Sequence, residues 1–291
     1  MIPAPVVGFI PSPSDNIVHL GPVPLHMYGL MLAIGVLVAV KVSEVRWVRR
    51  GHRAKEFNDI VVWVVIAGVI GARLYHVITD YELFTDDWLR AFKIWEGGLG
   101  IWGAVIGGAL AVVVLARRRH LDLGDLCDCI APGLVFAQAI GRWGNWFNQE
   151  LFGAPSKLPW ALKIDVAHRP DGYLRYATFQ PTFLYESLWC VAIGLALIWI
   201  DHHRKLKKFQ IFALYCMAYT AGRFVFEEMR IDPAHTIGPL RLNAWVSIVV
   251  FVGALAWFVW LNRHGEPVER PDPHGQSVAD VSTQGTASES A

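Results

Sequence analysis

Seven apolar stretches, each of roughly 15–20 residues, recur along the chain, and a helix of this length crosses the hydrocarbon core of a bilayer. Hydrophobic residues make up 54% of the 291 residues and charged residues only 18%, which leaves too little polar surface for an ordinary soluble globule. The sequence therefore predicts an all-α integral membrane protein with seven transmembrane helices. The predicted spans are 24–42, 60–78, 97–116, 126–140, 182–200, 209–226 and 244–261.

Basic residues gather after the first, third, fifth and seventh spans, and short loops rich in Lys and Arg stay in the cytoplasm. We therefore expect an external N-terminus, a cytoplasmic C-terminus and a long external segment at about 141–181. The leader has no basic stretch or cleavage site, so we expect no removable signal peptide. Residues 1–265 are predicted to form one polytopic membrane domain, and 266–291 a disordered cytoplasmic tail. The basic residues are Lys41, Arg46, Arg49, Arg50, Arg53, Lys55, Arg117, Arg118, Arg119, Arg204, Lys205, Lys207, Lys208 and Arg263.

Polar and aromatic residues alternate in the segment 141–153, directly after the fourth span. It contains Arg142, Asn145, Asn148 and Glu150 among tryptophan and phenylalanine rings. An arginine that faces lipid at mid-depth costs roughly 2.5–3.5 kcal/mol, so it normally faces a partner or a wet cavity. The natural partner of Arg142 is an anion.

The sixth span carries Tyr219, Arg223 and Glu227 at positions i, i+4 and i+8, which lie on one helix face. One interpretation is an Arg223–Glu227 pair that neutralises itself. The predicted topology, however, brings this face to the same side of the membrane as Arg142 and Glu150. Two arginines that converge with two carboxylates favour a binding site.

Other polar residues near the predicted spans have two interpretations. His26 and Tyr28 open the first span, where Tyr28 is either an interfacial anchor or part of the site. Arg73 lies in the second span and either snorkels outward or binds an anionic headgroup. Glu186 enters the fifth span, where it needs a partner or a proton, and a structural role is favoured over a catalytic one.

Several common motifs carry little weight here. The pattern Gly98-x-Gly100-x-x-Gly103 fits a dinucleotide-binding fingerprint, but no strand precedes it. Gly103 and Gly107 instead predict close packing of two helices. The chain has no His-Glu-x-x-His, Gly-x-Ser-x-Gly or P-loop motif, and we expect no metal ion and no cofactor. A net charge of +1 with scattered basic clusters argues against a nucleic-acid partner.

The chain resembles the bacterial prolipoprotein diacylglyceryl transferases over about residues 20–262. The match is collinear and specific, because spacing and chemistry agree at six separate places. The family's fold, seven transmembrane helices with the N-terminus outside, agrees with the topology expected from the basic loops. The matching motifs are His26-x-Tyr28-Gly29-Leu30, Gly71-x-Arg73, Trp95-x-Gly97-Gly98, the run 141–153, Pro181-x-x-Leu184-Tyr185-Glu186 and Tyr219-x-x-x-Arg223-x-x-x-Glu227.

The resemblance implies transfer of a diacylglyceryl group from phosphatidylglycerol to the lipobox cysteine of a prolipoprotein signal peptide, at the outer face of the bacterial cytoplasmic membrane. It forms a thioether, releases glycerol phosphate and begins lipoprotein maturation. Arginines aimed at the phosphate would stabilise the departing anion in the transition state. The implied catalytic residues are Arg142, Arg223, Glu150, Glu227, Tyr28 and His26, and the implied phosphatidylglycerol-binding residues are Arg142, Asn145, Asn148, Gly153, Tyr219 and Arg73.

One departure from the family pattern concerns the proton acceptor. Trp102 stands where many members carry a histidine that is often proposed as a base, so the resemblance assigns no acceptor and we expect a packing role for Trp102. The alternative functions are a membrane transporter or a binder of anionic lipids. The odd number of spans and the lack of a visible internal repeat count against a transporter.

Overall fold

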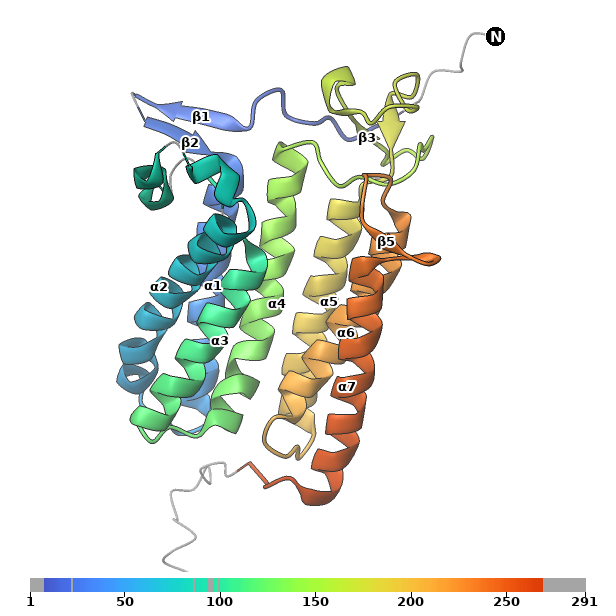
Figure 1. Ribbon diagram of the computed structural model, residues 1–291. Helices are drawn as coiled ribbons and strands as arrows, with labels where there is room; N and C mark the ends of the chain where they lie inside the picture. Colours follow the sequence, from blue (N-terminus) through green and yellow to red (C-terminus); the bar gives the residue numbers. More distant parts are fainter. Residues whose placement is uncertain (1–7, 22, 86, 94–96, 99, 269–291) are drawn as a thin grey trace, which may run out of the picture. The chain divides into compact units, whose positions relative to one another are not determined.

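The computed structural model describes residues 8–21, 23–85, 87–93, 97–98 and 100–268. Within these residues the chain is mostly helical, with seven α-helices (Figure 1). The chain divides into two compact units. Unit 1 comprises Met1–Ser43 and Cys127–Val268, and unit 2 is built from Glu44–Leu126.

The seven helices follow the seven apolar stretches. The helices are α1 (Met27–Arg49), α2 (Ala54–Thr79), α3 (Ile101–Arg118), α4 (Leu123–Phe147), α5 (Thr182–His203), α6 (Gln210–Met229) and α7 (Leu242–His264). Short 3-10 helices occur at η1 (Tyr81–Phe84), η2 (Trp88–Phe92) and η4 (Val166–His168).

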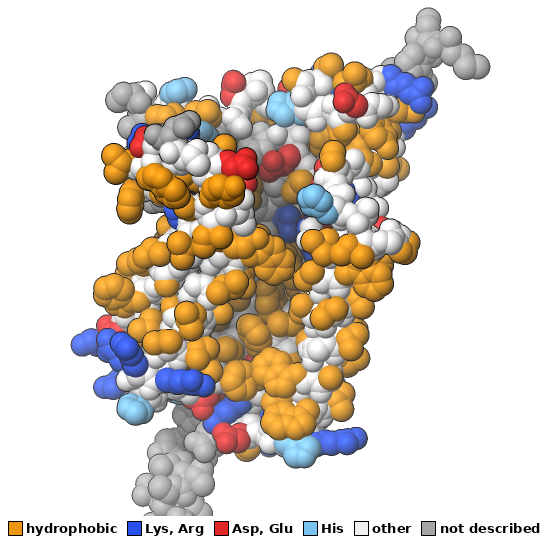
Figure 2. Space-filling view, in the orientation of Figure 1, with side chains coloured by type: hydrophobic (Ala, Val, Ile, Leu, Met, Phe, Trp, Pro, Cys, Tyr) orange, Lys and Arg blue, Asp and Glu red, His pale blue; other side chains and the backbone are white. Residues whose placement is uncertain are grey.

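Six of these helices are long and apolar enough to cross a membrane, namely α1 to α5 and α7. Helix α6 is the exception among the described residues, because Gln210, Arg223, Glu227 and Glu228 lower its apolar content. Hydrophobic side chains cover the sides of the helices in each unit, as expected for surfaces that face lipid (Figure 2). The predicted multi-pass membrane fold is therefore supported by six spans.

The expectation of an all-α fold was wrong in one respect, because three two-stranded antiparallel sheets are present. Two of the three hairpins turn at a glycine, Gly21 or Gly238, with φ of 63° and 61°. In the sequence each of these glycines is followed by a proline. Apolar periodicity alone does not reveal such turns, whereas a Gly-Pro pair is a turn signal. The pairs are β1 (Ile17–Leu20) with β2 (Val23–His26), β3 (Leu162–Lys163) with β4 (Thr178–Phe179), and β5 (Thr236–Ile237) with β6 (Leu240–Arg241).

The fourth helix is longer than predicted. The expected span ended at residue 140, but α4 continues to Phe147, so the segment after it is shorter than the predicted 141–181. On the added turns Trp143 is 38% exposed, while Asn145 is buried. The sequence boundary failed because a helix with one polar face has low average hydropathy. The predicted disordered tail lies outside the described residues beyond Val268.

Small residues allow the helices of unit 1 to approach closely. A Cβ at Gly133 would collide with the carbonyl of Ala39, and a Cβ at Gly144 would collide with the ring of Tyr28, so α1 and α4 are in contact at two levels. A Cβ at Gly222 would collide with Trp189 of α5. This packing fixes how each helix is rotated about its axis, and so which side chains face one another. The core comprises Ala131, Val135, Ala139, Cys190, Ile193, Leu197 and Ile211.

In unit 2 the backbones of α2 and α3 cross at glycines. A Cβ at Gly103 would collide with the carbonyl of Gly71, and a Cβ at Gly107 with that of Ala67. The prediction of close helix packing at Gly103 and Gly107 is confirmed. At the other end of this unit, Arg50 Nη1 lies 2.8 Å from Asp125 Oδ1, and both side chains are buried.

Candidate active site

Four helix ends of unit 1 meet at one place. The C-terminal turns of α4 and α6 lie beside the N-terminal turns of α5 and α7, close to the β3 and β5 hairpins (Figure 1). Arg142 of α4, Glu186 of α5 and Arg223 of α6 stand in these turns. Helices that alternate in direction thus bring distant polar residues to one level.

Glu186 is the carboxylate that two arginines share. Its Oε2 lies 2.9 Å from Nε of Arg142 and 3.6 Å from Nη1 of Arg223, and its side chain is only 5% exposed. A buried carboxylate requires such partners, because an unpaired charge away from water is costly. The interpretation of Glu186 as a structural residue missed that it joins the two arginines that the sequence singled out.

Glu227 is fully buried and holds a second set of donors. Its Oε2 lies 2.6 Å from Nη2 of Arg223 and 3.2 Å from Nη1 of Arg230. Its Oε1 accepts from Arg241 and from the amide of Asn243, both at 3.3 Å. The predicted Arg223–Glu227 pair is present, but it is one part of a larger network.

Asp232 completes this network beyond the end of α6. Arg230 binds it through two parallel hydrogen bonds of 2.8 Å, the fork geometry typical of Arg and carboxylate. Arg241 also donates to the Asp232 backbone carbonyl. Partial burial by itself raises the pKa of the Asp232 carboxyl. The hydrogen bonds from Arg230 and the charges of Arg230 and Arg241 outweigh that effect and hold the pKa below its ordinary value.

The network has an excess of positive charge. Four guanidinium groups, Arg142, Arg223, Arg230 and Arg241, face three carboxylates, Glu186, Glu227 and Asp232, which leaves a net charge of +1. Nη1 of Arg223 is buried, and although it lies 3.6 Å from Oε2 of Glu186 it donates no hydrogen bond within the described residues. A buried donor without an acceptor is costly, so this site favours an additional anionic oxygen. A cavity of about 280 Å³ borders the network at Glu227.

Glu150 lies in a second polar cluster, with the asparagines of α4. Its Oε1 accepts from Nδ2 of Asn145 at 2.8 Å and from Nδ2 of Asn148 at 3.2 Å. Across the residues that the structure describes, no arginine lies within ion-pair distance of Glu150. The predicted convergence of all four charged residues therefore holds for Arg142, Arg223 and Glu227, while Glu150 binds the carboxamides.

A strained turn aims Glu150 back toward α4. Its neighbours Gln149 and Leu151 have φ of 52° and 59°, a left-handed conformation that non-glycine residues rarely adopt. Three hydrogen bonds fix the Gln149 side chain, two of them to Asp165 and one to the carbonyl of Pro13. Strain of this kind persists only where the surroundings hold it, and it is typical of functional sites.

The remaining predicted residues of unit 1 border these clusters. Tyr28 packs its ring against Gly144, one residue from Asn145. Tyr219 Oη lies 3.5 Å from Nη2 of Arg142. Gly153 donates to the carbonyl of Gln180, and the space beside its Cα is filled from three sides. His26 is exposed at the end of β2.

Arg73 belongs to unit 2, where it binds backbone carbonyls. It donates to the carbonyl oxygens of residues 90, 91, 93, 97 and 98 at 2.5–3.3 Å. Its guanidinium also lies over the ring of Phe84. The residue thus organises the segment between α2 and α3. Trp102, the second residue of α3, is 46% exposed.

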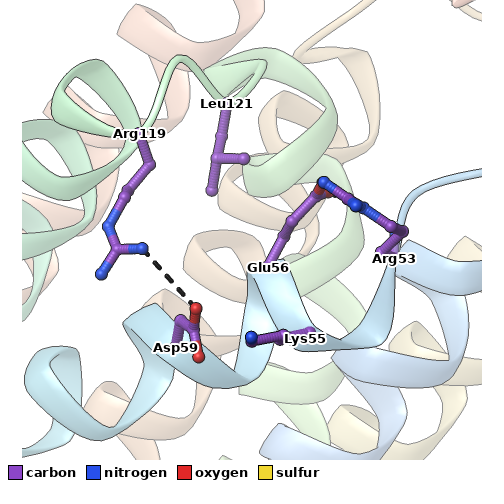
Figure 3. A pocket seen from close by; sticks show the side chains of 6 residues that line it. All are labelled: Arg53, Lys55, Glu56, Asp59, Arg119 and Leu121. Atoms are coloured by element: carbon purple, nitrogen blue, oxygen red, sulfur yellow. Dashed lines mark hydrogen bonds and ion pairs between the residues drawn. The ribbon is translucent and has the colours of Figure 1, made fainter.

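A cavity of about 350 Å³ lies at the other end of unit 2 (Figure 3). Its charges are paired internally, with Arg53 Nε 2.9 Å from Glu56 and Arg119 Nη1 3.6 Å from Asp59. Exposed pairs of this kind contribute little energy. The cavity is lined by basic residues of two connections that the sequence predicts to be cytoplasmic.

Sequence reasoning missed four residues of the network. Arg230, Asp232, Arg241 and Asn243 lie in the connection between α6 and α7 or in the first turn of α7. The Arg-x-Asp spacing at residues 230–232 was an available signal, because it allows the arginine to form two hydrogen bonds with the nearby carboxylate. Nothing in the sequence indicated that Arg241 reaches Glu227.

Comparison with known proteins identifies the family. The family model for prolipoprotein diacylglyceryl transferase matches residues 15–260. The chain is 52% identical over 257 residues to the phosphatidylglycerol–prolipoprotein diacylglyceryl transferase of Streptomyces griseus, which covers 87% of this chain and 78% of that protein. It is 49% identical over 257 residues to the protein of the same name from Cutibacterium acnes, with 87% of each chain covered. The chain therefore belongs to the prolipoprotein diacylglyceryl transferase family.

Proposed function

We propose that the cluster around Glu186 and Glu227 binds the phosphate of phosphatidylglycerol, and that the chain transfers the lipid's diacylglyceryl group to the lipobox cysteine of a prolipoprotein signal peptide. The observation that carries this proposal is the net charge of +1 with a buried Arg223 donor. A phosphodiester supplies one negative charge and oxygens that accept from a guanidinium fork.

The reaction forms one bond and breaks another. The cysteine sulfur attacks the terminal glyceryl carbon, the bond from that carbon to the phosphate oxygen breaks, and the electron pair leaves with glycerol phosphate. Negative charge grows on the leaving oxygen in the transition state. Arg142 and Arg223 stabilise that charge more than they stabilise the bound lipid, which is what raises the rate.

The carboxylates keep the two arginines in place. Glu186 holds Arg142 and Arg223 at one level, and Glu227 holds the second nitrogen of Arg223. Fixed donors in a buried site need little rearrangement as charge develops. Glu227 in turn is held by Arg230 and Arg241, which act through it as positioning residues.

The cluster at Glu150 suits the polar headgroup and the nucleophile. Asn145 and Asn148 are proposed to orient the glycerol of the headgroup, and Tyr28, Tyr219 and His26 to line the site, with Gly153 allowing close backbone approach. A cysteine with pKa about 8.5 is a few per cent thiolate at neutral pH, so the nucleophile needs only modest activation. Arg73 is also proposed to contribute to lipid binding.

In the proposed orientation α6 also crosses the membrane, which adds a seventh span to the six described above. The N-terminus is external and the C-terminus is cytoplasmic. The site then faces the outer side of the bacterial cytoplasmic membrane, where secreted substrates arrive. Reporter fusions test this directly. Fusions at Arg118 and Lys207 should give a cytoplasmic signal and a tag at Asp171 an external one, and a cytoplasmic signal at Asp171 would contradict the orientation.

The decisive experiment for function is transfer in a purified system. Protein in detergent is incubated with phosphatidylglycerol labelled in its acyl chains and with a lipobox peptide. A thioether-linked diacylglyceryl peptide, absent with a peptide in which serine replaces the cysteine, supports the proposal. Bound or translocated lipid without any peptide product would instead indicate a binder or transporter of anionic lipids.

A further inference from the structure

A second polar pair lies one helical turn deeper in unit 1 than the arginine site. Nε2 of Gln138 lies 2.9 Å from Oη of Tyr215, and four residues further along both helices Arg142 lies 3.5 Å from Tyr219. Helices α4 and α6 therefore run in the same direction here, and the pairs are stacked along them. Four residues of helix rise by about 6 Å. The Tyr215 and Tyr219 rings are stacked, with centroids 5.9 Å apart.

This pair has hydrogen-bonding capacity that the protein does not use. Oε1 of Gln138 is buried and has no partner within the described residues. The Gln138 amide has two possible orientations. In the first, its N–H donates to the Tyr215 hydroxyl oxygen, and the hydroxyl hydrogen of Tyr215 has no acceptor. With the amide turned over, Tyr215 donates to Gln138 and the amide N–H groups remain free. At least one donor is therefore unused in either orientation.

The surroundings make an unused donor expensive. Tyr215 packs against the apolar core of Ala139, Cys190 and Ile211. An unpaired polar group in such a medium is unfavourable, because no water is available to replace the missing partner. The pair therefore favours a ligand that brings an acceptor but no charge. Arg142 and Arg223, one helical turn away, instead favour an acceptor that carries a negative charge.

We infer that Gln138 and Tyr215 form a subsite for an acyl ester carbonyl of the donor lipid. This inference rests on the proposed function. In a glycerophospholipid the ester carbonyls lie a few covalent bonds deeper than the phosphate, which matches the turn of about 6 Å between the two pairs. An ester carbonyl is a neutral acceptor. Holding it one turn below Arg142 fixes the terminal glyceryl carbon between the carbonyl and the phosphate.

The subsite also makes a chemical distinction among lipids. The ester groups stay on the diacylglyceryl group during transfer, so the hydrogen bond exists before and after the reaction. Its loss should therefore raise KM for the lipid more than it lowers kcat. A lipid with ether-linked chains has the same phosphate and headgroup but no carbonyl, and it cannot use the subsite.

The test compares diacyl and dialkyl-ether phosphatidylglycerol with a lipobox peptide as acceptor. Wild-type protein should show a KM about threefold to tenfold higher for the ether lipid, the range of one hydrogen bond. Tyr215→Phe and Gln138→Leu should raise KM for the ester lipid by a similar factor and leave that for the ether lipid unchanged. Tyr173→Phe, a half-buried tyrosine outside the site, is the matched control and should keep the wild-type ratio.

If Gln138 and Tyr215 have a purely structural role, their variants should raise KM for the ester lipid and the ether lipid by the same factor. This result would overturn the ester subsite. Equal KM values for the two lipids in wild-type protein would also overturn it. A failure of wild-type protein to transfer from either lipid contradicts the proposed function itself. A second readout is independent of activity: the infrared band of isotope-labelled ester carbonyls should shift to lower frequency on binding to wild-type protein, and should not shift with Tyr215→Phe.

Discussion

The Nε atom of Arg142 lies 2.9 Å from Oε2 of Glu186, although the two residues come from different helices. The same carboxylate oxygen lies 3.6 Å from Arg223. A single buried glutamate of α5 thus sets the spacing of two guanidinium groups, one on α4 and one on α6. We therefore expect the site to act as a fixed receptor for one anion, and this expectation predicts how variants should behave.

Arg142→Ala should lower the transfer rate by about 10²- to 10³-fold, the usual effect of removing one donor that stabilises a developing anion. Arg142→Lys should recover only a small part of this loss, because an ammonium cannot contact Glu186 and a phosphate as a fork. The measurement is initial transfer rate at saturating peptide, with membrane insertion checked by protease protection. Near-wild-type turnover in the alanine variant would remove Arg142 from the phosphate site.

Glu186→Gln should reduce both stability and transfer, because it leaves two buried arginines without their shared counter-ion. Breaking a buried ion pair from one side costs about 3–5 kcal/mol, so the melting temperature in detergent should fall. Leu188→Ala on the same helix is the control, since Leu188 is 59% exposed on the apolar surface. An unchanged melting temperature and rate in Glu186→Gln would show that the two arginines do not depend on this carboxylate.

Asp232→Asn tests the outer part of the network through its pH dependence. The pKa of Asp232 is lower in the folded chain than the ordinary value near 3.9. Its contribution to stability is therefore complete above the unfolded pKa and disappears as pH falls through the folded pKa. The difference in melting temperature between wild type and Asp232→Asn should be constant above about pH 5 and shrink below about pH 4. If the difference in melting temperature instead grows as the pH falls, the pKa of Asp232 is not lowered in the folded chain.

Two glycines of α3 should respond in opposite ways to the same substitution. A Cβ at Gly103 would meet the carbonyl of Gly71, whereas nothing lies within 4 Å of a Cβ at Gly108. Gly103→Ala should destabilise unit 2 by about 1–3 kcal/mol through overpacking. Gly108→Ala should be neutral or stabilise by up to about 1 kcal/mol, since alanine favours a helix. Equal shifts in thermal unfolding would mean that α2 and α3 do not cross at Gly103.

The sequence by itself determined the helical membrane fold, because apolar runs of membrane-spanning length have few other stable arrangements. It also identified one face of α6, since residues spaced by four stand above one another on any helix. The glycine pattern correctly indicated that α2 and α3 pack closely. These conclusions depend on residues that are near in sequence, where helix geometry alone fixes the relationship.

Only the tertiary structure decided which charges meet. Glu186 joins Arg142 to Arg223, and Arg241 reaches Glu227, because side-chain packing fixes the rotation of each helix about its axis. Glycines such as Gly144 and Gly222 set that rotation by admitting Tyr28 and Trp189. The sequence gives a helix its face but not the partner that the face meets. Pairs between distant segments are a product of packing, which is why the shared carboxylate and the Gln138–Tyr215 pair emerged only from the fold.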